Sequence, residues 1–191
     1  MRRVCLGFDG SLNNDWTAIR AETLDGFQFT PTYGPDRRST IWNPAEWGGE
    51  IPRAEVHAAV DELFTTMEVE RSYWDPEDWR SDIDGWALAY GEKRVVQWPT
   101  NRVVAMHAAL ERMVTDLVTG ELTHDGCPIT AVHVANARKL ARPGQRYVLG
   151  KPNESQKIDA AMASVLAHEA AADARAAGWA KPVDRRVVVF R

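Results

Sequence analysis

Three aspartates stand where predicted strands end or a predicted helix begins, and together they could hold divalent metal ions. Asp9 follows the apolar run of residues 4–8, Asp75 directly precedes Pro76, and Asp159 lies in the first turn of an alanine-rich helical segment. Each also has an ordinary structural explanation as a turn residue, a helix N-cap or a charge that complements the helix dipole. A site for two ions about 3.5–4 Å apart, however, needs several hard oxygen ligands from separate elements. The combination therefore predicts a carboxylate site for two divalent metal ions.

The chemistry that such a site favours is hydrolysis of a phosphodiester bond. If the strands that end at Asp9 and Asp75 pair in parallel, they lie about 4.8 Å apart, and the two carboxylates can share an ion that activates water. A second ion between Asp9 and Asp159 would stabilise the leaving 3′ oxygen. Asp15 is a candidate fourth oxygen donor or a neighbour that orients the ligands, although residues 13–15 are equally typical of a turn.

A basic segment precedes the predicted last helix. Residues 134–157 contain one acid, Glu154, and six basic residues: Arg138, Lys139, Arg142, Arg146, Lys151 and Lys157. Pro143-Gly144 in the middle of this segment predicts a β-hairpin whose arms carry positive charge. Such a hairpin could contact DNA phosphates, whereas charge alone is equally compatible with a solvated face.

The elements that would position these residues alternate between strand and helix patterns. Strands are predicted in residues 2–9, 16–23, 27–34, 69–75 and 94–98, and a last one in 185–190. Residues 34–51 are expected to form a loop, and helices are predicted from residue 52 to about 67 and in residues 76–90, 101–119, 129–137 and 155–177. The pattern indicates an α/β layer fold with a mixed sheet.

Length and composition limit the class of protein. A chain of 191 residues with 45% apolar and 26% charged residues fits one globular domain, with a tail from about residue 179. Two distant cysteines indicate neither a disulfide framework nor a thiolate metal site. Charged residues interrupt the alanine-rich segment, so no membrane association is expected. The histidines include no His-Glu-x-x-His pattern, which disfavours a zinc hydrolase.

Four segments resemble the nuclease domain of tailed-phage terminase large subunits. They are GFDGSLNNDWTAI with Asp9, YWDPEDW with Asp75, HDGCPITAVHVANA, and GKPNESQKIDAAMASVLA with Asp159, and the similarity spans about residues 3–178. The resemblance implies a ribonuclease H-like fold with strand order 3-2-1-4-5 and Mg²⁺- or Mn²⁺-dependent cleavage of concatemeric viral DNA. It also implies an ATPase domain, a small terminase subunit and a portal as partners, in the cytoplasm of the infected bacterial host.

The ATPase motor half of such a protein is not expected in this chain. No G-x-x-x-x-G-K-[ST] motif occurs, and the closest segment, residues 144–152, has the wrong spacing and ends in proline. We therefore expect a single nuclease domain over residues 1–191, either one part of a longer protein or the product of a separate gene. The sequence leaves three other functions open: a Holliday-junction-resolvase-like nuclease, a non-catalytic module that docks on a portal, and an actin-like ATPase lobe.

Overall fold

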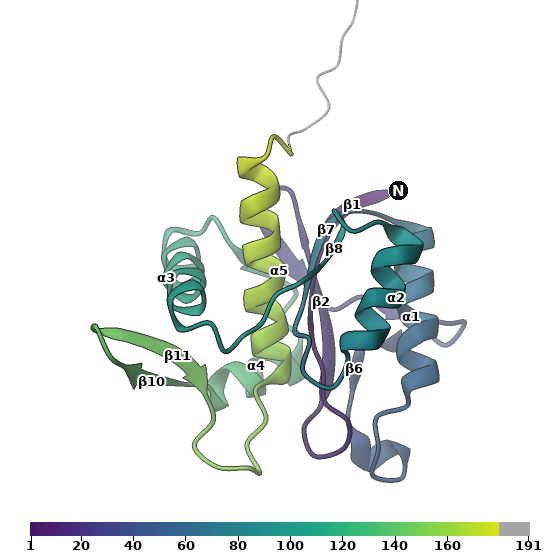
Figure 1. Ribbon diagram of the computed structural model, residues 1–191, viewed down its shortest axis with the longest axis horizontal. Coiled ribbons are helices and arrows are strands. Elements are labelled where there is room, and N and C mark those ends of the chain that lie inside the picture. The colour runs from purple at the N-terminus through teal and green to yellow at the C-terminus, as the bar shows by residue number, and fades with distance from the viewer. Residues whose placement is uncertain (180–191) are drawn as a thin grey trace, which may run out of the picture.

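The computed structural model describes residues 1–179, so the strand predicted in residues 185–190 lies outside the described part of the chain (Figure 1). The strands are β1 (Arg2–Asp9), β2 (Thr17–Thr23), β3 (Phe27–Phe29), β4 (Thr32–Tyr33), β5 (Arg38–Ser39), β6 (Ile41–Trp42), β7 (Met67–Trp74), β8 (Val95–Gln97), β9 (Thr123–His124), β10 (Arg138–Arg142) and β11 (Arg146–Gly150). The helices are η1 (Pro44–Trp47), α1 (Arg53–Thr66), α2 (Arg80–Tyr90), α3 (Val103–Thr119), α4 (Pro128–Asn136) and α5 (Asp159–Ala176).

A mixed sheet forms the centre of the molecule, as the sequence predicts. Its order is β8-β7-β1-β2-β3-β9, with β6 paired to β2. The five strands expected from the sequence therefore run in the order 3-2-1-4-5, and β9 extends the sheet beyond β3. Strands β1 and β7 are parallel, and β1 and β2 are antiparallel. This arrangement places the ends of β1 and β7 at the same edge of the sheet.

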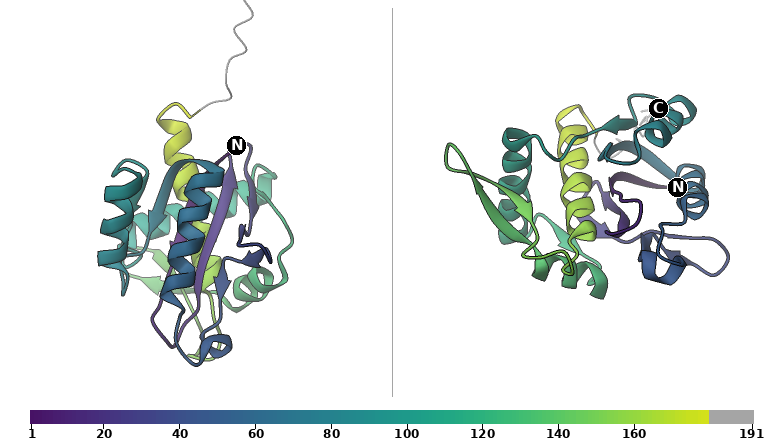
Figure 2. Two further views of the ribbon diagram at one scale, coloured as in Figure 1. Left: turned by 90° about the vertical axis from the view of Figure 1, so that its right-hand side faces the viewer. Right: turned by 60° about the horizontal axis from the view of Figure 1, so that its bottom comes forward.

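The alternation of side chains along β1 assigns its two faces to different layers. Val4, Leu6 and Phe8 pack with α1 and α2 in one core cluster, whereas Cys5 packs in a second cluster with α3 and α5. Figure 2 shows the strands between α5 on one side and α1 on the other. Asp9, two residues after Gly7, therefore belongs to the α5 face of β1.

Helix α5 lies unusually close to β1 at Gly7. A Cβ atom at this position would lie 2.1 Å from the carbonyl oxygen of Ala163 and 2.2 Å from the amide nitrogen of Ala167. Both distances are to backbone atoms, which cannot rotate away as a side chain can. The small residues on both sides thus set the distance between the helix and the strand, and α5 is buried along most of its length.

Several predicted boundaries are wrong. Helix α2 begins at Arg80 rather than at residue 76, because Asp78 has a φ of 59°, in the left-handed region that helices do not use. Helix α5 begins at Asp159 rather than near Ser155, since residues 152–156 form turns and bends and residues 157–158 are outside any helix or strand. Residues 34–51, expected as a loop, contain β5, β6 and η1.

The basic hairpin predicted around Pro143-Gly144 is present as β10 and β11. Its strands are antiparallel, and Figure 1 shows the hairpin projecting from the body beside α3. Tyr147 attaches it to α3, because its amide donates to His107 Nδ1 at 3.4 Å and its hydroxyl donates to Glu111. Among the helices of residues 1–179, none has the length and apolar character needed to cross a membrane.

The contact between Gly7 and α5 gives a first testable expectation. Gly7→Ala should lower the free energy of unfolding by about 1–3 kcal/mol or more, since the added methyl group must displace backbone. Gly85→Ala is the matched control, because Gly85 lies in α2 and an added Cβ would have no described atom within 4 Å apart from its chain neighbours and the nearby backbone of α2. That change should stabilise the protein by about 0.5–1 kcal/mol. Urea denaturation measures both, and equal stabilities of Gly7→Ala and the wild type would contradict the close packing.

Candidate active site

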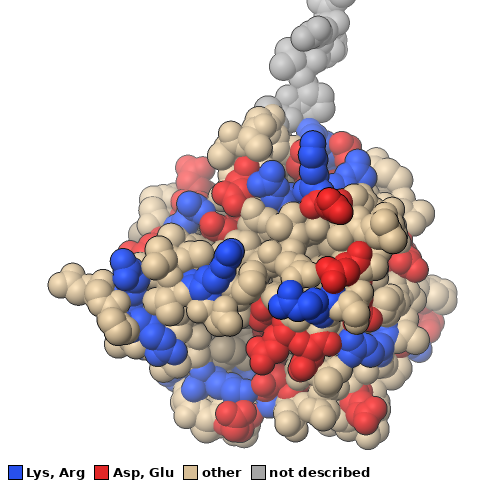
Figure 3. Space-filling view, viewed as in Figure 1, with Lys and Arg blue, Asp and Glu red and all other residues tan. Residues whose placement is uncertain are grey.

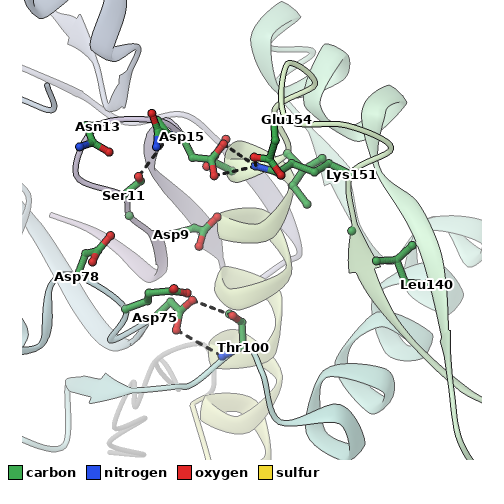
Figure 4. A pocket seen from close by; sticks show the side chains of 16 residues that line it. Asp9, Ser11, Asn13, Asp15, Asp75, Asp78, Thr100, Leu140, Lys151 and Glu154 are labelled. Atoms are coloured by element: carbon green, nitrogen blue, oxygen red, sulfur yellow. Dashed lines mark hydrogen bonds and ion pairs between the residues drawn. The ribbon is translucent and has the colours of Figure 1, made fainter. Parts of the chain in front are cut away.

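Asp9 and Asp75 meet at the edge of the sheet where β1 and β7 end. The strands are in register at Phe8 and Trp74, and the amide of Asp75 donates to the carbonyl oxygen of Phe8 at 3.0 Å. The two carboxylates line an open pocket of about 530 Å³ together with Asp159, as the sequence predicts for the three aspartates. Figure 4 shows this pocket between the loop after β1, the loop after β7 and the segment before α5.

The carboxylate of Asp75 is oriented by Thr100, which sequence reasoning missed. The Thr100 hydroxyl donates to Asp75 Oδ2 at 2.7 Å, and the Thr100 amide lies 3.4 Å from Oδ1 (Figure 4). Thr100 follows β8, the neighbour of β7 in the sheet. A threonine after Pro99 carries no local signal for this role, because the contact depends on the pairing of β7 with β8.

Asp159 reaches the pocket because α4 fixes the start of α5. The amide of Ala160 donates to His133 Nδ1 at 3.0 Å, and Asn136 donates to the carbonyl oxygen of Lys157 at 3.0 Å. Burial and the nearby Lys157 ammonium lower the pKa of His133 to about 4, so the imidazole is neutral at pH 7 and can accept. Asp159 is buried, and its Oδ2 atom has no hydrogen-bond partner among the described residues.

Burial raises the pKa of all three carboxyl groups, and at Asp9 the other two carboxylates add to this effect. Burial and the nearby carboxylates of Asp159 and Asp75 raise the pKa of Asp9 well above its usual value. Burial also raises the pKa of Asp75, although the hydrogen bonds from Thr100 oppose this effect. The pKa of Asp159 is raised to about 6, chiefly by burial and in part by Asp15. Clustered carboxylates of this kind are typical of sites that bind a cation or perform catalysis.

Asp15 lines the same pocket but is paired with two lysines. Lys151 Nζ lies 2.8 Å from both of its carboxylate oxygens, and Lys157 Nζ lies 2.7 Å from Oδ1. Partial burial opposes ionisation of Asp15, but the hydrogen bonds from the two ammonium groups outweigh it and lower the pKa of the carboxyl. In this conformation Asp15 is a partner of the lysines, and its metal-ligand role stays a prediction.

The residues present fit a divalent cation, although they do not form a closed set of ligands. Within residues 1–179, no group of three or more His, Cys, Asp or Glu side chains has an arrangement that could hold a metal ion. The donors that line the pocket are carboxylate oxygens, which Mg²⁺ and Mn²⁺ prefer. The unpartnered Oδ2 of Asp159 and the raised pKa of Asp9 both indicate negative charge that a cation would compensate.

Three further acids at the pocket, Glu77, Asp78 and Glu154, were not assigned a role from the sequence. Glu77 adds to the repulsion that raises the pKa of Asp9. Glu77 stands two residues after Asp75, and this position is the sequence signal by which it could have been identified. Glu154 lies 2.9 Å from Lys151, so its charge is partly compensated.

The predicted DNA-binding residues divide into two groups. Four lie on β10 and β11 with exposed side chains, outside the residues that line the pocket: Arg138, Lys139, Arg142 and Arg146. The other two, Lys151 and Lys157, are bound to Asp15. Figure 3 shows acidic side chains gathered near the centre of this face, with Lys and Arg side chains to their left, toward the hairpin. The surface thus combines an acidic pocket with a basic flank.

Curated proteins of mycobacteriophages are similar to this chain in sequence. Gene 13 protein of Mycobacterium phage D29 is 33% identical over 184 residues, and Gene 13 protein of Mycobacterium phage L5 is 33% identical over 183 residues. Each match covers 90% of this chain, and the chain spans about 30% of the length of these relatives. No protein-family model matches the chain.

Solved structures of phage terminase nucleases have the same fold. The large terminase nuclease of thermophilic phage G20c has a TM-score of 0.60 at 15% identity and covers 88% of this chain and 82% of its own. The HK97 bacteriophage large terminase has a TM-score of 0.65 at 17% identity and covers 88% of this chain and 39% of its own. The G20c nuclease is also known with bound magnesium, at a TM-score of 0.58 and 13% identity, covering 88% of this chain and 81% of its own. The chain therefore has the fold of these large terminase nuclease domains.

The raised pKa of Asp159 predicts a specific dependence of stability on pH. The folded-state pKa of about 6 lies above the ordinary pKa of an aspartate, about 4, so this carboxyl reduces stability as pH rises from about 4 to about 6. Asp159→Asn removes that cost. In EDTA, the melting temperature of the variant should exceed that of the wild type at pH 7 and approach it at pH 4.

The control is Asp36→Asn, which removes one negative charge from an exposed side chain outside the pocket. Melting curves of the three proteins between pH 4 and pH 8 test the expectation. A wild-type protein that is more stable than Asp159→Asn at pH 7 would show that the Asp159 carboxylate stabilises the fold.

Proposed function

We propose that the protein is a metal-dependent endonuclease that cuts concatemeric viral DNA during genome packaging. The observation that carries this proposal is the convergence of Asp9, Asp75 and Asp159 in one open pocket, from three separate elements of a terminase nuclease fold. The bound magnesium named for the G20c nuclease supports the use of a divalent metal.

The side chains of the pocket have separate tasks in this reaction. Two divalent ions, Mg²⁺ or Mn²⁺, would supply an activated water and compensate the charge that develops on the leaving 3′ oxygen. The charges of Asp159 and Asp75 both raise the pKa of Asp9, and Asp9 would bind both ions. Asp75 would bind the first ion, with its carboxylate held in place by Thr100. Asp159 would bind the second, from the start of a helix whose backbone is fixed by α4.

The hairpin would hold the DNA while the pocket cleaves it. The four exposed basic residues of β10 and β11 lie outside the pocket, whereas Leu140 and Gly150 of the same strands line it. A phosphate backbone bound along the hairpin would therefore pass beside the carboxylates. Contacts of this kind carry little information about base identity, so cleavage should have low sequence specificity.

The proposed partners are those that the resemblance to terminase large subunits implies: an ATPase domain, a small terminase subunit and a portal, in the host cytoplasm. The mycobacteriophage relatives extend far beyond the matched 30%, which is compatible with a further domain in those proteins. The substrate is double-stranded DNA. Preferential cleavage of branched over linear DNA would instead favour a function like that of Holliday-junction resolvases.

Substitution of the pocket carboxylates tests the reaction. Asp9→Asn, Asp75→Asn and Asp159→Asn should each reduce nicking of supercoiled plasmid in Mg²⁺ or Mn²⁺ by about 100-fold or more, the scale on which a group that stabilises transition-state charge acts. Thr100→Val keeps the shape and removes the hydrogen bond to Asp75. This variant should lose less nicking activity than the aspartate variants, about 10–100-fold.

Asp36→Asn, outside the pocket, should nick at the wild-type rate, and EDTA should stop nicking by every active variant. Circular dichroism checks that each variant is folded. Full activity of purified Asp9→Asn would remove the assigned site, and wild-type nicking in EDTA would exclude the metal.

Charge removal on the hairpin tests how the DNA is held. The triple variant Arg138→Ala, Arg142→Ala and Arg146→Ala should weaken binding to duplexes of any sequence. It should also flatten the dependence of log K on log salt by about 0.9 for each phosphate that the hairpin no longer neutralises. Fluorescence anisotropy at several salt concentrations measures this slope.

The control variant removes Lys93 and Arg94, two exposed basic residues next to β8. It should keep the wild-type slope. An unchanged slope in the hairpin variant would mean that the basic side chains of the hairpin only face solvent and do not contact DNA phosphates.

A further inference from the structure

Two lysines bind Asp15 at the rim of the acidic pocket. Lys151 follows β11 and Lys157 precedes α5, so both belong to the segment that connects the hairpin to the last helix. Their ammonium groups lie 2.7–2.8 Å from the Asp15 carboxylate, as Figure 4 shows for Lys151. Lys157 also donates to the carbonyl oxygen of Asn14 at 2.6 Å. The contacts join two segments that are more than 130 residues apart in sequence.

These contacts occupy a carboxylate that could otherwise serve the metal site. Asp15 lies in the turn between β1 and β2, after Asp9 in the chain and in the same pocket. The side chains of Lys151 and Lys157 are only 20% and 18% exposed, so their ammonium groups are directed inward rather than into solvent. The lysines thus hold two positive charges against Asp15, inside the surface of the protein.

We propose that Lys151 and Lys157 keep Asp15 from binding metal until their ammonium groups bind DNA phosphates instead, so that DNA binding and metal binding are coupled. The inference rests on the proposed nuclease function and adds regulation to the same site. With DNA present, both lysines would contact the phosphate backbone, and Asp15 would become an oxygen ligand beside Asp9.

The chemistry of the groups supports this exchange. An ammonium group binds carboxylate and phosphate oxygens alike as a point charge. Residues 151–158 belong to no helix or strand, so Lys151 can change partner without breaking an element. Lys151 also follows directly on the hairpin proposed to hold DNA. A phosphate that reaches the pocket from the hairpin therefore meets this lysine before it meets the carboxylates.

A binding measurement without turnover tests the coupling. Ca²⁺ is the probe ion because it binds carboxylate oxygens, and the ligand is a 20-base-pair duplex whose integrity is checked on a gel after each titration. Isothermal titration of Ca²⁺ into the wild-type protein should give an affinity about tenfold higher with saturating duplex than without it. By linkage, Ca²⁺ must raise duplex affinity by the same factor.

Charge compensation at the pocket could also couple the two ligands, so the decisive result is a double-mutant cycle between Lys151 and Asp15. Lys151→Met keeps the aliphatic stem and removes the ammonium group. In the absence of DNA this variant should bind Ca²⁺ several-fold more tightly than the wild type. In an Asp15→Asn background the same substitution should have a much smaller effect on Ca²⁺ affinity, because the Asp15 carboxylate is gone and only that of Glu154 is released.

Arg142→Ala is the matched control, since it removes a positive charge from the hairpin without contact to Asp15. It should weaken duplex binding and leave Ca²⁺ affinity without DNA unchanged. An equal effect of Lys151→Met in both backgrounds would overturn the proposal, because the lysine would then act by general charge. Ca²⁺ and DNA binding that are independent of each other would overturn it too. A protein that binds neither ligand would refute the nuclease function itself.

Discussion

The close contact between α5 and β1 is the constraint on which the site depends. Gly7 allows the backbone of α5 at Ala163 and Ala167 to lie directly on the strand, with no space for a side chain between them. Two residues after Gly7, β1 ends at Asp9, and one turn before Ala163, α5 begins at Asp159. Because backbone atoms rather than rotatable side chains set this separation, the two carboxylates keep their relative position although their charges repel each other. A less rigid scaffold could relieve that repulsion simply by moving the helix away.

A buried polar network supplements this packing at the other end of α5. Glu22 of β2 is fully buried and accepts hydrogen bonds from Gln28 at 3.0 Å and from Arg175 of α5 at 3.0 Å, while His168 of α5 lies 2.9 Å from it. Such a network fixes one arrangement of helix and strand, since displacement of α5 would leave a buried carboxylate without partners. Shape complementarity at Gly7 and charge pairing at Glu22 therefore hold the same helix at two points. The carboxylate pocket lies next to the contact at Gly7, where β1 ends at Asp9 and α5 begins at Asp159.

The sequence predicted the parts of the fold and site whose signals are local. Asp9 and Asp75 could be found because each lies at the end of a recognisable strand, and most of the strands and the basic hairpin have clear boundaries in turn residues. The strand predicted over residues 27–34 is an exception, because β3 ends at Phe29 and Thr32–Tyr33 belong to a separate sheet. The starts of α2 and α5 were wrong because tertiary contacts decide them: Asp78 adopts a positive φ, and α5 begins only where His133 binds its first turn. Thr100 could not be predicted, since only the pairing of β7 with β8 brings it to Asp75. The same limit applies to Lys151 and Lys157, which were grouped with the hairpin on charge alone.

The separation of acidic and basic residues onto different elements also has a physical reason. A pocket that concentrates carboxylates repels phosphates, so if DNA is the substrate as proposed, affinity for it must come from outside the pocket. If the basic residues lay among the aspartates, they would pair with them, as Lys151 and Lys157 do with Asp15, and neither group would be available for its own ligand. The hairpin avoids this loss because its four exposed cations lie outside the pocket. In the proposed mechanism, Lys151 and Lys157 belong to both groups, and their contact with Asp15 would transmit occupation of the basic surface to the acidic pocket.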